Sequence, residues 1–91
     1  MRIHQIQVRH TLSVADKEDL ARQAGRFKSD IHFLLNDETV QVDAKSLLGL
    51  LLQSLSQGTR LTVRTRGSDE LEALEYVCDL LESPQPSSGS A

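Results

Sequence analysis

Apolar and polar residues alternate in four short stretches of the chain, which is typical of β-strands with one buried face. The apolar positions are Ile6 and Val8, then Ile31, Phe33 and Leu35, then Val40 and Val42, and finally Leu61 and Val63. Polar residues 36–38 separate the second stretch from the third and predict a hairpin turn. In the fourth stretch, we expect Arg60, Thr62 and Arg64 to point to water.

Helical spacing appears between and after these strands. The first such segment begins near Asp16, which we expect to cap it, because a short carboxylate accepts hydrogen bonds from free amides of the first turn. Its core positions are Leu20, Ala24 and Phe27. The last such segment begins at Asp69, which has capping-box spacing to Glu72. Its expected core positions are Leu71, Leu74, Val77, Cys78 and Leu81.

A further helix begins at Ser46 and is expected to end at Gly58. The element order is then strand, helix, strand, strand, helix, strand, helix, which predicts an α+β fold with one sheet covered by helices, an open-faced sandwich. Residues 1–82 form the predicted domain. Residues 83–91 offer no apolar anchor and are expected to be a disordered tail.

Composition narrows the possible functions. The chain has 91 residues, enough for one small core, and its net charge of −3 argues against a nucleic-acid binder. We find no membrane-spanning run and no signal peptide, so we expect a cytoplasmic protein. Cys78 is the only cysteine and is expected to be a buried hydrophobe. His4 and His32 lack the spacing of a metal site, and no cofactor motif is present.

The segment Lys45-Ser46-Leu47-Leu48-Gly49 and the leucine-rich helix after it carry a family resemblance. They resemble the regulatory-serine region of HPr, the small phosphocarrier of the bacterial sugar phosphotransferase system. The similarity extends over roughly residues 3–82. It implies an antiparallel four-stranded sheet in the order 1-4-2-3 with three helices on one face. The chain is about two residues longer than usual before Ser46, and we place the extra residues near 36–38.

The phosphoryl-carrying residues of that family are missing from the matching positions. The family uses a histidine followed one residue later by an arginine, just before the first helix. Counting back from Phe27, these positions hold Ser13 and Ala15. The chain therefore resembles the catabolite-repression paralogues of HPr that lack the catalytic histidine. His10, three residues upstream of Ser13, is the one candidate that could replace it.

Ser46 has a structural and a regulatory interpretation. As structure, it is an ordinary helix cap. As regulation, the resemblance implies that a serine kinase phosphorylates it, and that a transcription regulator of the catabolite-control type then binds. The leucines of this helix spread over roughly 200°, twice the width of a buried stripe, so some must be exposed. We expect Lys45, Leu47, Leu48 and Leu51 to contact the partner.

Three functions remain open on sequence alone. The first is a non-enzymatic regulatory adaptor that is phosphorylated at Ser46. The second is a phosphocarrier that uses His10. The third is an HPr-like domain with no role in phosphorylation. A monomer, a homodimer or an exchange of the first strand between two copies would each fit the pattern.

Overall fold

The computed structural model describes residues 1–83, which form strands and helices in the predicted order. The elements are β1 (Arg2–Gln7), α1 (Val14–Ala24), β2 (Asp30–Leu35), β3 (Val40–Asp43), α2 (Leu47–Leu51), β4 (Arg60–Arg66) and α3 (Glu70–Glu82). Ser83 follows α3 as its C-cap, and the rest of the expected tail lies outside the described residues. Within residues 1–83, no helix has the length and apolar character that crossing a bilayer requires.

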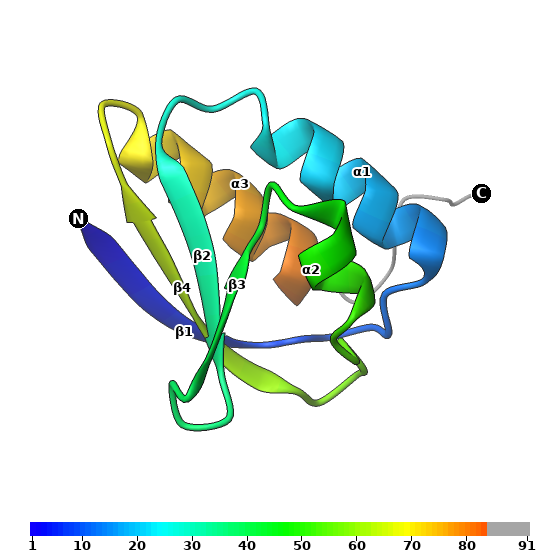
Figure 1. The fold of residues 1–91 in the computed structure, drawn as a ribbon. Coiled ribbons are helices and arrows are strands. Elements are labelled where there is room, and N and C mark those ends of the chain that lie inside the picture. The colour runs from blue at the N-terminus through cyan, green and yellow to red at the C-terminus, as the bar shows by residue number, and fades with distance from the viewer. Residues whose placement is uncertain (84–91) are drawn as a thin grey trace.

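The four strands form one antiparallel sheet in the order β1-β4-β2-β3. The helices cover one face of this sheet and leave the other face open (Figure 1). Alternation sets the faces, since Ile6 of β1 is buried while Gln5 and Gln7 beside it are exposed. The predicted α+β open-faced sandwich and the strand order are therefore confirmed.

An aliphatic core fills the space between the sheet and the helices. Each helix contributes at least one fully buried leucine, because each turns an apolar stripe toward the sheet. These side chains are Leu20 of α1, Leu50 of α2 and Leu81 of α3, and they meet Ile31 and Phe33 from β2.

The buried face of α3 differs in one position from the prediction. Ala73, Val77 and Leu81, at i, i+4 and i+8, are fully buried, whereas Leu71 is 40% exposed. Leu71 therefore lies off the stripe, and its assignment to the core was wrong. Cys78 is buried as expected, and burial raises the pKa of its thiol to about 11. The thiol stays protonated at neutral pH and packs as a small hydrophobe.

The centre of the open face of the sheet is less exposed to solvent than expected. Thr62 is buried, so the prediction that it points to water is wrong, although Arg60 is exposed and Arg64 is half-buried. β4 is an inner strand, and Thr62 lies between Gln5 of β1 and Leu34 of β2 in the register. Longer neighbours on both sides cover a short side chain in this position.

The second helix is shorter than the leucine pattern suggests. α2 contains five residues and ends at Leu51, so the prediction that it extends to Gly58 was wrong. Gly58 has a φ of +94°, and its amide donates to the carbonyl of Val8 at 2.8 Å. This glycine therefore turns the chain into β4 and does not close a helix.

The hairpin between β2 and β3 is confirmed at the predicted turn. Asn36, Asp37 and Glu38 have φ angles of 54°, 56° and 68°, so three consecutive residues are left-handed. The amide and the hydroxyl of Thr39 donate to the carbonyl of Asn36 at 3.1 and 2.7 Å and close the turn. Asn and Asp tolerate this conformation, whereas glutamate adopts it at a cost of about 1–2 kcal/mol.

Asp69 connects α3 to the segment that enters β2. Its side chain caps no helix amide, so the predicted capping box with Glu72 is wrong. Instead, its carboxylate accepts hydrogen bonds from the amides of Lys28 and Ser29, each at 2.9 Å, and from the Ser29 hydroxyl at 2.5 Å. A Cβ on Gly67 would lie 2.6 Å from Ser29 Cα, so only glycine fits there.

We predict that Asp69→Asn destabilises the fold at neutral pH and that the difference disappears in acid. Hydrogen bonds from the Ser29 hydroxyl and then the Lys28 amide lower the pKa of Asp69 from 3.8 to about 2. Because the folded-state pKa is the lower one, the stabilisation is complete above pH 3.8 and is lost as the pH falls toward 2. Urea unfolding of both proteins at several pH values tests this, with the exposed Asp79→Asn as the control. A difference that persists unchanged at pH 2 would contradict the assignment.

Candidate functional site

The N-terminus of α1 is closed by its own side chains. Ser13 is the N-cap, and its hydroxyl accepts a hydrogen bond from the amide of Asp16 at 3.1 Å. The Asp16 carboxylate in turn accepts the amide of Ser13 at 2.9 Å. This is a reciprocal capping box, so the expectation that Asp16 is the cap itself was wrong by three residues. Val14 and Ala15 are exposed and bring no base or cation to this place.

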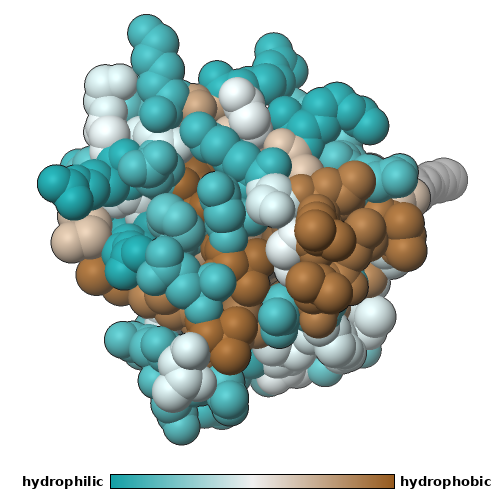
Figure 2. Space-filling model, viewed as in Figure 1, coloured by the Kyte–Doolittle hydropathy of each residue, from teal (hydrophilic) through white to brown (hydrophobic). Residues whose placement is uncertain are grey.

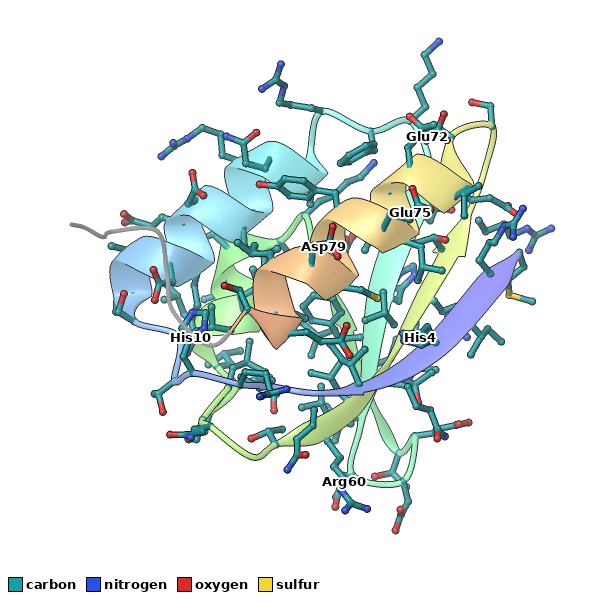
Figure 3. All side chains as sticks on the ribbon, turned by 180° about the vertical axis from the view of Figure 1, so that it is seen from behind. His4, His10, Arg60, Glu72, Glu75 and Asp79 are labelled. Atoms are coloured by element: carbon teal, nitrogen blue, oxygen red, sulfur yellow. The ribbon has the colours of Figure 1, made fainter. Side chains whose placement is uncertain are left out.

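His10 lies at the other end of the same loop, beside the end of α3 (Figure 3). Its Nδ1 is 2.8 Å from the carbonyl oxygen of Ser83. A carbonyl only accepts, so this contact requires a proton on Nδ1. The Arg9 amide donates to the carbonyl of Leu81 at 3.0 Å and holds the loop against the same helix. His10 is therefore anchored to α3, and Ser13 caps α1.

Ser46 caps α2 as the structural interpretation predicts. Its hydroxyl accepts a hydrogen bond from the amide of Gly49 at 3.1 Å, and its own amide donates to the carbonyl of Asp43 at 2.9 Å. The side chain is half-buried. With five residues, α2 has a weak dipole, so a phosphate on Ser46 would act mainly by adding charge to the surface.

Lys45, the residue before this serine, is engaged within the protein. Its ammonium donates to the carbonyl of Phe27, just beyond the end of α1, at 2.9 Å. Its amide donates to the carboxylate of Asp43 at 2.9 Å. Lys45 therefore ties the start of α2 to α1. A contact with a partner would have to share or break the bond to Phe27.

An exposed apolar surface follows Ser46 along α2. Leu48 is 68% exposed, Leu51 41% and Leu52 73%, while Leu47 is half-buried. We call these four side chains the leucine surface. Figure 2 shows it as the large hydrophobic area over α2. Large exposed apolar areas on small proteins commonly mark binding sites.

The sequence analysis missed Leu52 as a member of the leucine surface. In a helix that continues to Gly58, Leu52 would be one interior residue among several leucines. The observed helix ends at Leu51, so Leu52 is its C-cap and is exposed. Val14, at the start of α1, is also 59% exposed, and the sequence analysis made no assignment for it.

Lys17 holds the segment that follows α2. The side chain is buried, and its ammonium donates to the backbone carbonyl of Gln53 at 2.7 Å. A buried ammonium needs such an acceptor, because leaving it unpaired would be costly. This bond fixes α1 relative to the end of α2 and so supports the shape of the leucine surface.

We predict that Lys17→Met lowers the free energy of unfolding by about 1.5–3 kcal/mol, since it removes a charge-assisted hydrogen bond and leaves the carbonyl of Gln53 unpaired. Methionine keeps the length and apolar character of the stem. Urea unfolding measures the loss, and Lys28→Met, at an exposed lysine, is the control. Equal stability of the two variants would show that the bond contributes nothing.

The part of the chain that the structure describes contains no group of side chains arranged as a metal site. Among residues 1–83, no three His, Cys, Asp or Glu side chains come together as metal ligands. Glu72, Glu75 and Asp79 project from the outer side of α3 (Figure 3) and form a charged helix face. The site therefore consists of Ser46, the leucine surface and the capped start of α1.

Comparison with known proteins gives consistent matches. A family model described as PTS-HPr, the PTS HPr component phosphorylation site, matches residues 4–83. The HPr-like protein Crh of Bacillus subtilis (strain 168) is 41% identical over 56 residues, which is 62% of this chain and 64% of that protein. The matched part thus spans slightly less than two thirds of this relative's length.

Solved structures agree with the fold. The HPr of Thermoanaerobacter tengcongensis superimposes with a TM-score of 0.82 at 26% identity, covering 98% of this chain and 100% of that one. The Crh of Bacillus subtilis, whose structure is described as an intertwined dimer with a swapped domain, gives a TM-score of 0.70 at 29% identity. That match covers 87% of this chain and 88% of Crh.

Proposed function

Because the chain belongs to the HPr family, we propose that it is a non-enzymatic regulatory adaptor of the cytoplasm. A serine kinase phosphorylates Ser46, and the phosphorylated protein binds a transcription regulator of the catabolite-control type. Members of this family are phosphocarriers and regulators. The proposal assigns this chain to the regulators.

One observation carries the proposal. The start of α1, where the family resemblance expects the phosphoryl-carrying histidine, is occupied by the capping box of Ser13 and Asp16. Ser46, in contrast, directly precedes the exposed leucine surface. A phosphate on Ser46 would add about two negative charges at the edge of the leucine surface. A partner could then bind the phosphate and the apolar side chains at the same time.

The charge around Ser46 favours a cationic partner. Lys45 is the cation adjacent in sequence, and its ammonium already donates to the carbonyl of Phe27. A phosphate on Ser46 would therefore be left largely unpaired by the protein itself. An arginine or lysine of the partner would form an ion pair with this phosphate. The leucine surface would pack against apolar residues of the partner around that cation.

The test is phosphorylation with ATP and an HPr serine kinase. We expect a stable phosphate ester on the wild-type protein and none on Ser46→Ala. Ser13→Ala is the matched control, because Ser13 and Ser46 are both helix caps and each substitution removes one cap. Loss of phosphate from both variants would point to a folding defect. Phosphate retained by Ser46→Ala would overturn the assignment.

The oligomeric state concerns a different part of the molecule, the edge of the sheet. β1 lies at the edge of the sheet and pairs with β4 alone. The same pairing could be made by β1 of a second copy, and a swapped dimer is described for Crh of Bacillus subtilis. We include a homodimer in the proposal, as one form beside the monomer. Light scattering on the purified protein distinguishes the two.

A further inference from the structure

Three arginine side chains of β4 lie on the open face of the sheet, the face that the helices leave uncovered (Figure 1). They are Arg60, Arg64 and Arg66. Side chains alternate between the two faces of a strand, and the residues that alternate with these arginines are buried on the helix side, namely Leu61, Val63 and Thr65. Alternate residues of a strand lie about 7 Å apart, so the three arginines extend over roughly 20 Å.

The three guanidinium groups are unpaired within residues 1–83. The ion pairs of this part of the chain involve other cations, which are the N-terminal ammonium, Arg2 and Arg22. Asp30 lies opposite Arg66 in the register, but no ion pair joins them. Like charges in one row repel each other, so the row does not itself stabilise the fold. The guanidinium groups are therefore available to a ligand.

The strand on one side of this row carries no charge on the open face. Ile3, Gln5 and Gln7 of β1 lie there, and all three are exposed. Ile3 is directly opposite Arg64 in the register. We call these three residues and the three arginines the arginine strip. It is two strands wide and combines cations with amide groups and one exposed apolar side chain.

Carboxylates limit the arginine strip on its other side. Asp30 of β2 and Asp43 of β3 are exposed on the same face, and Asp43 lies opposite His32. The whole chain has a net charge of −3, so the positive area is local. A nucleic-acid duplex or a membrane would cover the entire face and meet these carboxylates, whereas a single segment of polypeptide fits on two strands.

The arginines determine which groups that segment carries. A guanidinium donates two parallel hydrogen bonds to a carboxylate, which makes this pair stronger than a neutral one. Carboxylates at alternate residues of an extended segment are about 7 Å apart, like Arg64 and Arg66. We propose that the arginine strip binds an acidic segment of a partner protein, in which Asp or Glu alternates with other residues. The leucine surface lies on α2, in the helix layer, so the two surfaces do not overlap.

The test is NMR titration of the full-length protein with a short peptide in which glutamate alternates with threonine, at about 20 mM salt. We expect saturable shifts of the amides of residues 3–7 and 60–66, with a Kd on the order of 1 mM that rises several-fold at about 150 mM salt. The same peptide with glutamine in place of glutamate should cause no such shifts. Equal binding of the two peptides, or shifts confined to other residues, would overturn the proposal. Tighter binding of a single-stranded DNA oligonucleotide of equal charge would overturn the choice of a protein partner.

Paired substitutions make the assignment specific. Arg64→Gln with Arg66→Gln should weaken binding of the glutamate peptide at least about fivefold, because two of the three cations are removed. Arg9→Gln with Arg22→Gln is the matched control, since it changes the net charge equally at two exposed arginines outside the strip. The control should lose less than about twofold in affinity. Unchanged affinity in the first variant, or an equal loss in the control, would refute the site.

Two further variants separate this result from folding and from phosphorylation. Arg64 is half-buried, so Arg60→Gln with Arg66→Gln, at two exposed positions, repeats the test without a change near the core. It should weaken binding to a similar extent, and wild-type affinity would count against the strip. Ser46→Ala should bind the glutamate peptide as the wild type does. Failure of the adaptor proposal and failure of this one are therefore distinguishable.

Discussion

The double substitution Leu48→Ser and Leu52→Ser is expected to abolish most of the affinity for the partner while leaving the fold intact. Both side chains are more than two thirds exposed, so they contribute little to the core. If they are the centre of the docking area, their loss should cost about 2.5 kcal/mol of binding, which is roughly a 70-fold higher Kd. The unfolding free energy should change by no more than about 0.5 kcal/mol.

The measurement is calorimetric titration of the Ser46-phosphorylated protein with a catabolite-control regulator from the same organism. Leu71→Ser is the matched control, because Leu71 is an exposed leucine on α3, a different helix. Affinity should survive in this control. Equal loss of affinity in the control and in the double variant would contradict the assignment of the leucine surface.

Leu50→Ala, unlike the double substitution at the surface, is expected to lower the free energy of unfolding strongly. Leu50 belongs to the same short helix but is fully buried in the core. Removing three carbons from such a position leaves a cavity and typically costs about 3–4 kcal/mol. A domain of this size has little stability to spare, so the unfolding midpoint in urea should fall strongly.

The comparison for Leu50→Ala is Leu48→Ala, in the same helix two residues away. This variant should change the unfolding free energy by less than about 1 kcal/mol. The two results together test whether α2 divides into a core side and a docking side as the burial of its leucines indicates. Similar costs at both positions would mean that the helix packs differently.

The fold could be predicted well because its signals are local. Alternation of apolar residues defined four strands, and helical spacing defined three helices, in the order that the structure has. The strand order came from the family resemblance, since periodicity carries no information about which strands are neighbours. Ser46 as a helix cap was also predictable, because its role depends only on the next turn of chain.

The errors arose where tertiary contacts outweighed local pattern. Asp69 has the spacing of a capping box, but its carboxylate instead binds Lys28 and Ser29 across the fold. Thr62 alternates as an exposed residue, but the strands on both sides of β4 cover it. Neither partner is close in sequence. Local rules therefore could not identify them.

The extent of α2 was overestimated for a similar reason. Six leucines between positions 47 and 55 suggest a long helix, but the chain leaves the helix at Leu51, and Leu55 reaches the core from the following loop. Lys17 stabilises this exit through the carbonyl of Gln53. This bond joins residues 36 positions apart, so the local pattern could not indicate it.

Phosphorylation by phosphoenolpyruvate and the general phosphotransferase enzyme tests the central claim most directly. We expect no acid-labile phosphate on this protein, because Ser13 is a capping residue and the Nδ1 of His10 is bonded to Ser83. An HPr that carries the active-site histidine serves as the positive control. Phosphohistidine on His10, transferred onward to a sugar permease component, would contradict the adaptor and establish a carrier.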